Sequence, residues 1–198
     1  MNLPAHAPLM LLPRAQLFPS ALLPLHIFEP RYRQMLLWSL EKDRMFCIAP
    51  MKPGIFEARG ASDFHHTVGI GLVRACVERE DGTSNLILQG LARMRIVGFL
   101  QDAPFRIAEL RELPSKPVPP AQSSELVGLL LAASSKLLTG EMQLPAQLEK
   151  QLEQIDDPAV LTDVIAHACL QDSEQRQVVF EELDVARRAA LLIRYLQA

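Results

Sequence analysis

The stretch Leu22–Leu37, LLPLHIFEPRYRQMLL, places a histidine, a glutamate, two arginines and a tyrosine between two apolar runs. The pair Glu29-Pro30 is typical of the start of a helix, because proline already has the backbone angle of the first turn and the helix dipole stabilises a carboxylate there. Apolar residues follow at helical spacing from Tyr32 onward, and we expect Tyr32 to face the core. The stretch therefore predicts a short strand that passes directly into a helix.

The polar residues of this joint also raise a functional question. His26, Glu29, Arg31 and Arg33 could form an acid–base cluster, or they could line a groove for a ligand or partner. Arg31 and Arg33 would point about 200° apart on a helix of 3.6 residues per turn, so they do not easily serve one small site. A purely structural connection between the strand and the helix explains most of the composition of this stretch. A binding groove and a catalytic cluster are the alternatives.

The length and composition of the chain limit the classes of protein to which it can belong. A chain of 198 residues is long enough for one large domain or two small ones with a real core. The formal net charge of −3 provides no overall basic surface for nucleic acid. The proline-broken N-terminus is not typical of a signal peptide, and no apolar run is long enough to cross a bilayer. We therefore expect a soluble, cytoplasmic protein with no membrane partner.

The cysteines give no sign of a disulfide framework or a zinc site. Cys47, Cys76 and Cys169 lie far apart in the sequence and form no C-x-x-C pair. Each sits in an apolar neighbourhood, which favours buried free thiols. Free thiols are consistent with a reducing cytosol.

Residues 1–112 read as short extended segments separated by turn residues, with one helix near residues 30–42. The strongest local signal is Asp81-Gly82 between two apolar, β-branched runs, since this pair supplies the positive φ angles that a tight hairpin turn requires. Gly90 interrupts the second run, where we expect a bulge that lets a sheet curl into a barrel. These features predict a small β-barrel.

The remainder of the chain reads differently. Residues 113–122 contain the proline-rich stretch LPSKPVPP, which is typical of an extended linker. From residue 123 to residue 198, apolar residues recur at helical spacing and predict a helical bundle. The predicted fold class is therefore α+β, a barrel followed by a bundle.

Several helix boundaries can be placed within this bundle. The signals are Gly140 as a C-cap, Asp157-Pro158 as a helix start, and Ser173 and Asp184 as N-caps. An amphipathic helix is also predicted from Leu144, Leu148 and Leu152. In the last helix Ala189, Leu192, Ile193 and Leu196 form the inward stripe, while Arg187, Arg188 and Arg194 lie off it.

The segment LFPSALLPLHIFEPRYRQML resembles the opening signature of the Lon protease N-terminal (substrate-binding) domain family. The later segments follow in a similar order: FCIA, VERE-DG-…LILQGLARMRI, PFRIAEL, DPAVLTDVIAHAC and EELDVARRAALL. The resemblance extends from about Leu9 to Leu196. It implies a PUA-like barrel followed by a helical bundle, and a role in recognising polypeptide substrates.

In Lon this region precedes an ATPase module and a Ser–Lys protease domain. The present sequence ends at Ala198 and contains neither a G-x-x-x-x-G-K-[ST] phosphate loop nor the serine-bearing motif of the Lon protease domain. The resemblance is therefore to a stand-alone N-domain protein. We expect neither protease nor ATPase activity, and no cofactor.

Other candidate residues give weak chemical signals. His65-His66 are adjacent on an expected strand and point to opposite faces, which favours a polar strand start over a metal site. His167 lies in an apolar helical stretch and is expected to be a partly buried, hydrogen-bonded histidine. Ser134 and Lys136 do not suggest a catalytic dyad, because neighbouring side chains on a helix diverge by about 100° per residue. We therefore predict no catalytic residues and no metal.

RNA binding is the alternative function for a PUA-like barrel. Arg93 and Arg95 share one face of a strand and could form a basic stripe with Arg74, Arg106 and Arg111. Aromatic residues for base stacking make up only 6% of the chain, and acidic residues are interleaved with these arginines. Solvated strand faces with cross-strand ion pairs are the favoured explanation of the pattern, and RNA binding is the alternative.

The sequence thus predicts a non-enzymatic module that binds a polypeptide segment or protein partner. A hydrolase or transferase would need a convergent nucleophile–base pair, and none is evident. The predicted contact residues, on the barrel or in a cleft beside the bundle, are His26, Phe28, Glu29, Arg31 and Arg93. Phe28 would supply apolar contact area, and the charged groups would orient backbone carbonyls or chain termini.

Overall fold

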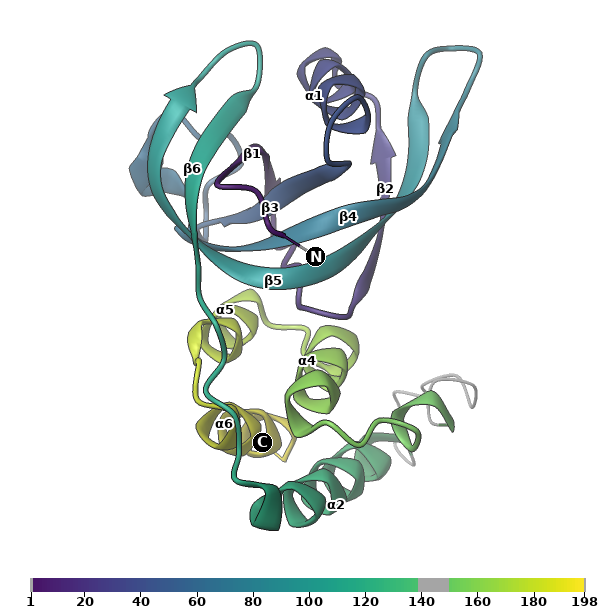
Figure 1. Ribbon diagram of the computed structural model, residues 1–198, viewed down its shortest axis with the longest axis vertical. Helices are drawn as coiled ribbons and strands as arrows, with labels where there is room; N and C mark the ends of the chain where they lie inside the picture. The colour runs from purple at the N-terminus through teal and green to yellow at the C-terminus, as the bar shows by residue number, and fades with distance from the viewer. Residues whose placement is uncertain (1, 139–149, 198) are drawn as a thin grey trace. The chain divides into compact units, whose positions relative to one another are not determined.

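The computed structural model describes residues 2–138 and 150–197 of the chain. The chain forms two compact units, Met1–Leu113 and Pro114–Ala198 (Figure 1). Strands dominate the first unit and helices form the second, so the predicted α+β class is confirmed. Within the described ranges, no helix combines the length and apolarity needed to cross a membrane.

The N-terminal unit is a closed β-barrel with one strand added at its side. Its elements are β1 (His6–Pro13), β2 (Leu22–Ile27), α1 (Pro30–Leu40), β3 (Met45–Met51), the 3-10 helix η1 (Ala61–Asp63), β4 (Thr67–Glu78), β5 (Ser84–Gln101) and β6 (Arg106–Glu112). The strand order is β2-β5-β4-β3-β1-β6, and a further pairing of β6 with β5 closes the barrel. β1 is parallel to β3 and the other pairs are antiparallel. Among the described strands β2 pairs only with β5, so it is an edge strand.

β5 serves both parts of the sheet because it bends in the middle. Its first half pairs with β2 and its second half with β6, and its register against β4 shifts beside Gly90, where Leu91 is the extra residue. The predicted bulge is confirmed. A Cβ atom at Gly90 would collide with the carbonyl oxygen of Phe18, and the Gly90 backbone forms hydrogen bonds of 2.9 Å with Ser20 and Ala21. The β1–β2 connection therefore lies directly against the bend.

The β4–β5 hairpin forms where it was predicted, but only Gly82 of the Asp-Gly pair has a positive φ angle. The N–H of Gly82 donates to the carbonyl of Arg79 at 2.9 Å, and the N–H of Arg79 donates to the carbonyl of Thr83 at 2.8 Å. This is a three-residue loop in which Gly82, at φ 74°, is the left-handed bulge residue. Asp81 instead accepts hydrogen bonds from the N–H and hydroxyl of Thr83, and these lower the pKa of its carboxyl.

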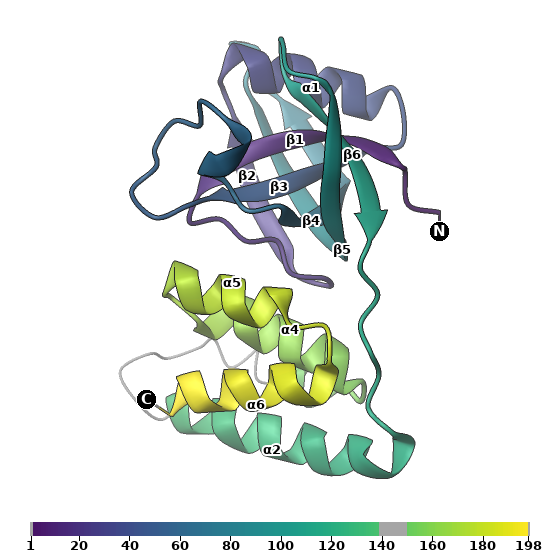
Figure 2. The same ribbon diagram turned by 90° about the vertical axis from the view of Figure 1, so that its left-hand side faces the viewer.

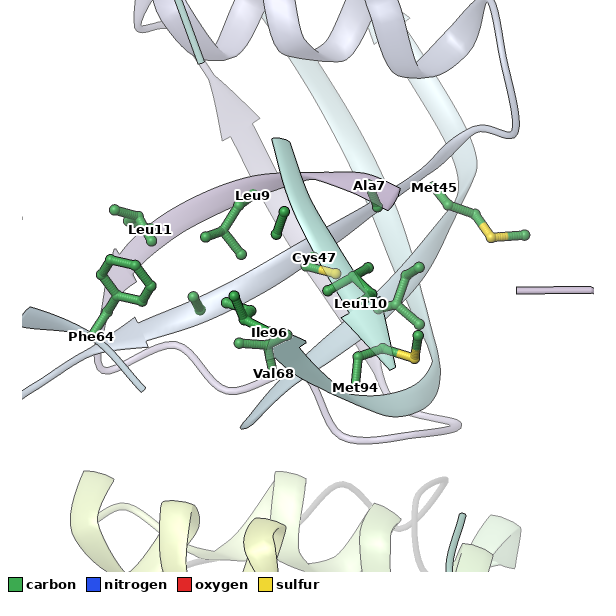
Figure 3. Packing of buried hydrophobic residues seen from close by; sticks show 13 residues of the cluster. Ala7, Leu9, Leu11, Met45, Cys47, Phe64, Val68, Met94, Ile96 and Leu110 are labelled. Carbon is green, nitrogen blue, oxygen red and sulfur yellow. The ribbon is translucent and has the colours of Figure 1, made fainter. Parts of the chain in front are cut away.

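Two apolar clusters fill the N-terminal unit. The first occupies the barrel interior, where Leu9 of β1, Cys47 of β3 and Ile96 of β5 meet (Figure 3). The second lies between α1 and the sheet, and includes Met35 of α1 and Leu88 of β5. The two sides of the curved sheet thus pack against different partners.

Tyr32 is the polar member of the second cluster. Its side chain is buried as predicted, and its hydroxyl accepts a hydrogen bond from the Leu11 N–H at 3.2 Å and donates one to the Leu11 carbonyl at 3.1 Å. Burial raises the pKa of this phenol. The contact ties the first turn of α1 to β1.

The cysteines follow the prediction in two of three positions. Cys47 and Cys169 are buried, and burial raises the pKa of each thiol, that of Cys169 to about 11. Cys76 is only partly buried, so the prediction was wrong for this thiol. It lies on the part of β4 that extends into the hairpin, where most residues of the strand are exposed.

The C-terminal unit is helical, and its helices α2, α4 and α6 pack against one another (Figure 2). The described helices are α2 (Pro120–Leu138), α4 (Pro158–Cys169), α5 (Ser173–Glu181) and α6 (Val185–Leu196). The predicted Gly140 cap and two residues of the predicted amphipathic helix, Leu144 and Leu148, lie outside the described residues.

Two of the three predicted helix starts carry the expected N-cap. Asp157 accepts a hydrogen bond from a backbone N–H at the start of α4, and Asp184 does so at the start of α6. The prediction of Ser173 as the cap of α5 was wrong by one residue. The carboxylate of Asp172 accepts the hydrogen bond from the Gln175 N–H at 2.8 Å, and Ser173 is the first helical residue.

The proline-rich segment before α2 is extended, but it is bound to the helical unit. The Lys116 N–H donates to the Leu183 carbonyl at 2.8 Å, and the Val185 N–H donates to the Lys116 carbonyl at 3.1 Å. Nζ of Lys116 also lies 3.2 Å from the Asp184 carboxylate. The following helix begins at Pro120, three residues before the predicted start of the bundle at residue 123, because proline at the first helical position loses no backbone hydrogen bond.

Arg188 of α6 lies in the interior, whereas the sequence predicted an outward side chain. It is 0% exposed, and its Nε lies 3.2 Å from the carboxylate of Asp163 on α4. Its Nη1 donates to the hydroxyl of Ser115 and to the carbonyl of Glu182, each at 3.0 Å. Because Arg188 and the buried Leu192 are four residues apart, they share the inward face of α6.

Candidate functional site

One side of the β2–β5–β4 sheet carries an exposed group of mainly apolar residues. Side chains alternate along a strand and cross-strand partners share a face, so the members of this side follow from the register. The exposed members are Leu22, Pro24 and His26 of β2, Asn85 of β5, and Ala75 and Val77 of β4, with the half-buried Ile87 of β5 between Pro24 and Ala75. Together with Phe28, which directly follows β2, we call them the β2 face. The other side of these strands packs against α1.

The β2 face leaves large apolar side chains in solvent. Leu22 is 56% exposed, Phe28 60% and Val77 65%. An open pocket of about 450 Å³ lies on this face, lined chiefly by Pro24, His26, Ala75, Val77, Asn85 and Ile87. Contiguous exposed apolar patches of this kind are typical of interaction sites, whereas single exposed apolar residues are ordinary.

A short polar network crosses the β2 face. The side-chain amide of Asn85 lies 2.8 Å from Nδ1 of His26. When the amide nitrogen donates to that Nδ1, the amide oxygen accepts from Nε and Nη2 of Arg79 at 3.3 and 2.8 Å. The three side chains then form a chain of hydrogen bonds in which every group has the correct role. This network fixes the His26 ring beside the apolar pocket.

Phe28, Glu29 and Arg31 continue from this network into the first turn of α1. The Phe28 ring stacks on the His26 ring with centroids 5.9 Å apart. Nε of Arg31 donates to the Glu29 carboxylate at 2.9 Å, and Nη2 of Arg31 lies 2.8 Å from the same oxygen. Four of the five predicted contact residues are therefore neighbours, but the two charged ones are paired with each other.

Arg93 does not join the other four predicted residues. It lies on β5 eight residues beyond Asn85, which is a distance of about 26 Å along an extended strand. Its side chain is also buried, with 3% of its surface exposed. A contact with the same ligand is therefore not supported by its position. The sequence placed Arg93 on a strand correctly but could not give its burial.

The other candidate side chains have local structural partners. Nε2 of His66 lies 2.8 Å from the carbonyl of Ala61, and β4 begins at the next residue, Thr67. Arg176 donates to the His167 carbonyl at 3.0 Å, and its Nη2 lies 3.3 Å from Nδ1 of His167, so the predicted hydrogen-bonded histidine is confirmed. Within residues 2–138 and 150–197, no three histidine, cysteine, aspartate or glutamate side chains are placed to hold a metal.

The arginines of the alternative RNA-binding stripe differ in their surroundings. Arg74 and Arg111 are exposed, whereas Arg93 is buried. Nε of Arg106 lies 3.5 Å from the Asp102 carboxylate, and its guanidinium lies 5.3 Å from the centroid of the Phe64 ring. The five arginines therefore do not form one continuous exposed stripe, and RNA binding stays a prediction.

Several members of the β2 face were not identified from the sequence. Val77, Asn85 and Ile87 belong to the hairpin that the sequence did predict. The signal that could have found them is the pairing of β2 with β5, because it brings His26 opposite Asn85. Nothing in the order of the residues reveals that pairing, since β2 and β5 are separated by four other elements.

Comparison with known proteins identifies relatives over nearly the whole chain. The family model of the ATP-dependent protease La (LON) substrate-binding domain matches residues 6–198. Lon protease 2 of Myxococcus xanthus is 24% identical over 196 residues, which cover 98% of this chain and 24% of that protein. The Lon protease of Escherichia coli K12 is 22% identical over 181 residues, which cover 91% of this chain and 23% of that protein.

Solved structures show the same fold. The N-terminal domain of the Mycobacterium avium complex Lon protease aligns with a TM-score of 0.73 at 18% identity, over 97% of this chain and 98% of that one. A Lon N-terminal domain protein from Xanthomonas campestris aligns with a TM-score of 0.69 at 20% identity, over 96% and 98%. The present chain spans about a quarter of the length of the curated relatives it matches.

Proposed function

The chain belongs to the ATP-dependent protease La (LON) substrate-binding domain family, and from this premise we propose that it binds polypeptide segments without catalysis, through the β2 face. The observation that carries the proposal is the group of exposed apolar side chains around an open pocket of about 450 Å³. A substrate-binding module needs an exposed surface whose burial by the substrate lowers the free energy, and apolar side chains provide such a surface. The β2 face meets this requirement.

Apolar burial would supply most of the affinity. Complete burial of one side chain such as Phe28 or Val77 contributes about 1.5–3 kcal/mol relative to full exposure. Both side chains are already partly covered, so each would contribute less. An extended segment that covers Leu22, Phe28 and Val77 together would gain enough to offset part of its ordering entropy.

The polar network would orient the bound segment. His26 and Asn85 lie at the pocket and offer donors and acceptors for backbone amides. Glu29 and Arg31 form an exposed ion pair, and such pairs contribute about 0–1 kcal/mol. We propose that these two residues contact the segment at the end of the face, and that their contribution is smaller than that of Phe28.

The test is binding of a labelled, permanently unfolded polypeptide to the full chain, followed by fluorescence polarisation. The combined substitution of Phe28→Ala and Val77→Ser is expected to weaken binding about tenfold or more, since it removes the two most exposed apolar groups of the face. Phe56→Ala is the matched control, because Phe56 is 82% exposed but lies in the β3–β4 connection.

Equal loss in the control and in the double variant would contradict the proposal, because binding would then depend on exposed aromatic surface in general. Unchanged affinity in the double variant would also contradict it. Binding of labelled RNA with a steep salt dependence would instead support the alternative of an RNA-binding barrel.

A further inference from the structure

We propose a second binding groove, between α1 and the β4–β5 hairpin, for a polypeptide segment that carries a carboxylate beside an apolar side chain. The groove has a volume of about 290 Å³, and its lining includes Arg33, Leu36, Leu37, Leu40, Arg44 and Cys76. We call it the α1 groove. Cys76 alternates with Ala75 and Val77 on β4, so the α1 groove and the β2 face lie on opposite sides of the hairpin. The inference therefore does not depend on the function proposed for the β2 face.

The guanidinium of Arg33 lies against the hairpin turn. A Cβ atom at Gly82 would collide with Nη2 of Arg33, so the guanidinium occupies space that any other side chain at position 82 would fill. Among the residues that the structure describes, the Arg33 guanidinium has no hydrogen bond or ion pair. A guanidinium with no charged partner among the described residues therefore lies at the edge of the groove, beside the turn.

Arg44 reaches the same groove from the connection after α1. It has a left-handed backbone with φ 58°, where glycine is the residue normally found, and its N–H donates to the Ser39 carbonyl at 2.8 Å. Its Nε donates to the Val73 carbonyl at 3.4 Å, and no carboxylate is paired with it among the described residues.

The two guanidiniums flank apolar surface. Leu36 and Leu40 form part of the lining, and Leu37 is 58% exposed at the same helix face. Arginine recognises carboxylates through two parallel hydrogen bonds, which favours an acidic group over other polar groups. A volume of about 290 Å³ lies at the lower end of the range for ligand pockets, so it suits one or two side chains of an extended segment.

Glu78 is the acidic residue that also lines the α1 groove. It forms no ion pair with Arg33 or Arg44 in the described part of the chain. One carboxylate against two guanidiniums leaves the groove with an excess of positive charge. A segment that brings a second carboxylate would balance it.

The test uses short peptides with blocked ends, in which Glu lies between two Leu residues, and an otherwise identical peptide with Gln. Fluorescence polarisation with the full chain is expected to give an affinity for the Glu peptide roughly 3- to 10-fold higher, and this preference should fall as salt rises from about 50 to about 500 mM. Equal affinity for the two peptides would overturn the proposal.

Two matched variants locate the binding site. Arg44→Gly and Arg14→Gly each remove an arginine from a left-handed position, at φ 58° and 59°, so neither should destabilise the fold through its backbone. Arg44→Gly is expected to abolish the preference for Glu, and Arg14→Gly is expected to keep it because Arg14 is not part of the groove. Equal loss in both variants would overturn the proposal.

Cys76 provides a second readout inside the α1 groove. It is the one thiol of three that is not buried, so an alkylating reagent should modify it first. A saturating concentration of the Glu peptide is expected to slow this modification several-fold. The same protection is expected in the Phe28→Ala variant, because Phe28 belongs to the β2 face and not to the α1 groove. An unchanged rate would mean that the peptide binds elsewhere, and loss of protection in Phe28→Ala would mean that the β2 face holds it. Either result would contradict the α1 groove.

Discussion

The barrel and the helical unit differ in the kind of side chains that fill their interiors. The barrel interior is an apolar cluster around Leu9, Cys47 and Ile96, whereas Arg188 ranks among the largest fully buried side chains and joins α6 to Asp163 on α4. Strands fix their partners through backbone hydrogen bonds, but helices satisfy their backbone internally. In the helical unit, the Arg188–Asp163 pair is a side-chain contact that joins α6 to α4 in the interior.

The largest expected effect comes from breaking that contact. Arg188→Met should destabilise the helical unit by about 3–5 kcal/mol, because it leaves the Asp163 carboxylate buried without its charged partner. The measurement is urea denaturation followed by far-ultraviolet circular dichroism, with the single tryptophan, Trp38 of α1, as a fluorescent probe of the barrel. The exposed neighbour Arg187 provides the control, Arg187→Met, which should cost little.

A double variant sharpens this comparison. If the cost comes from the uncompensated charge, Arg188→Met combined with Asp163→Leu should recover most of the lost stability. No recovery would mean that the shape of the arginine, or its hydrogen bonds to Ser115 and Glu182, matters more than its charge.

In the barrel, the next largest effect is expected from loss of the buried hydroxyl of Tyr32. Tyr32→Phe is expected to cost about 1–3 kcal/mol, since the N–H and carbonyl of Leu11 both lose their contact with the hydroxyl. The loss should appear in Trp38 fluorescence. The second tyrosine of the chain, Tyr195, gives the control Tyr195→Phe.

The same phenol predicts a pH dependence. Burial raises its pKa above the ordinary value of about 10, so its stabilising contribution is complete below pH 10 and is lost as the pH rises through the raised pKa. Tyr32→Phe should lack this part of the alkaline loss. An identical alkaline profile in the variant would contradict the assignment to Tyr32.

These contacts also show what could be predicted from the sequence. Tyr32, the hairpin and the bulge at Gly90 depend on local patterns, and all three are confirmed. The burial of Arg188 depends on Asp163, which belongs to another helix, and no local pattern reveals the pair. For the same reason Phe28 was identified but Val77 was not, because only the register of β5 against β4 brings Val77 to the β2 face.

The smallest expected effect concerns the start of α5. Asp172→Ala should cost about 1 kcal/mol, because the Gln175 N–H loses its capping oxygen, whereas Ser173→Ala should be within about 0.5 kcal/mol of the wild type. Urea denaturation followed by circular dichroism distinguishes the two. A larger loss of stability in Ser173→Ala than in Asp172→Ala would instead support Ser173 as the N-cap of α5.

The closure of the barrel has a consequence for how the chain folds as it is synthesised. β1 pairs with β6, with His6 opposite Glu109, so the first strand of the barrel meets its last one. The apolar β1 cannot complete its pairing on the ribosome until β6 has emerged, whereas α4, α5 and α6 follow one another closely in the chain. Non-local pairing of this kind slows folding and prolongs the exposure of strand edges. Nascent chains that stop before β6 should therefore be the forms most prone to aggregate.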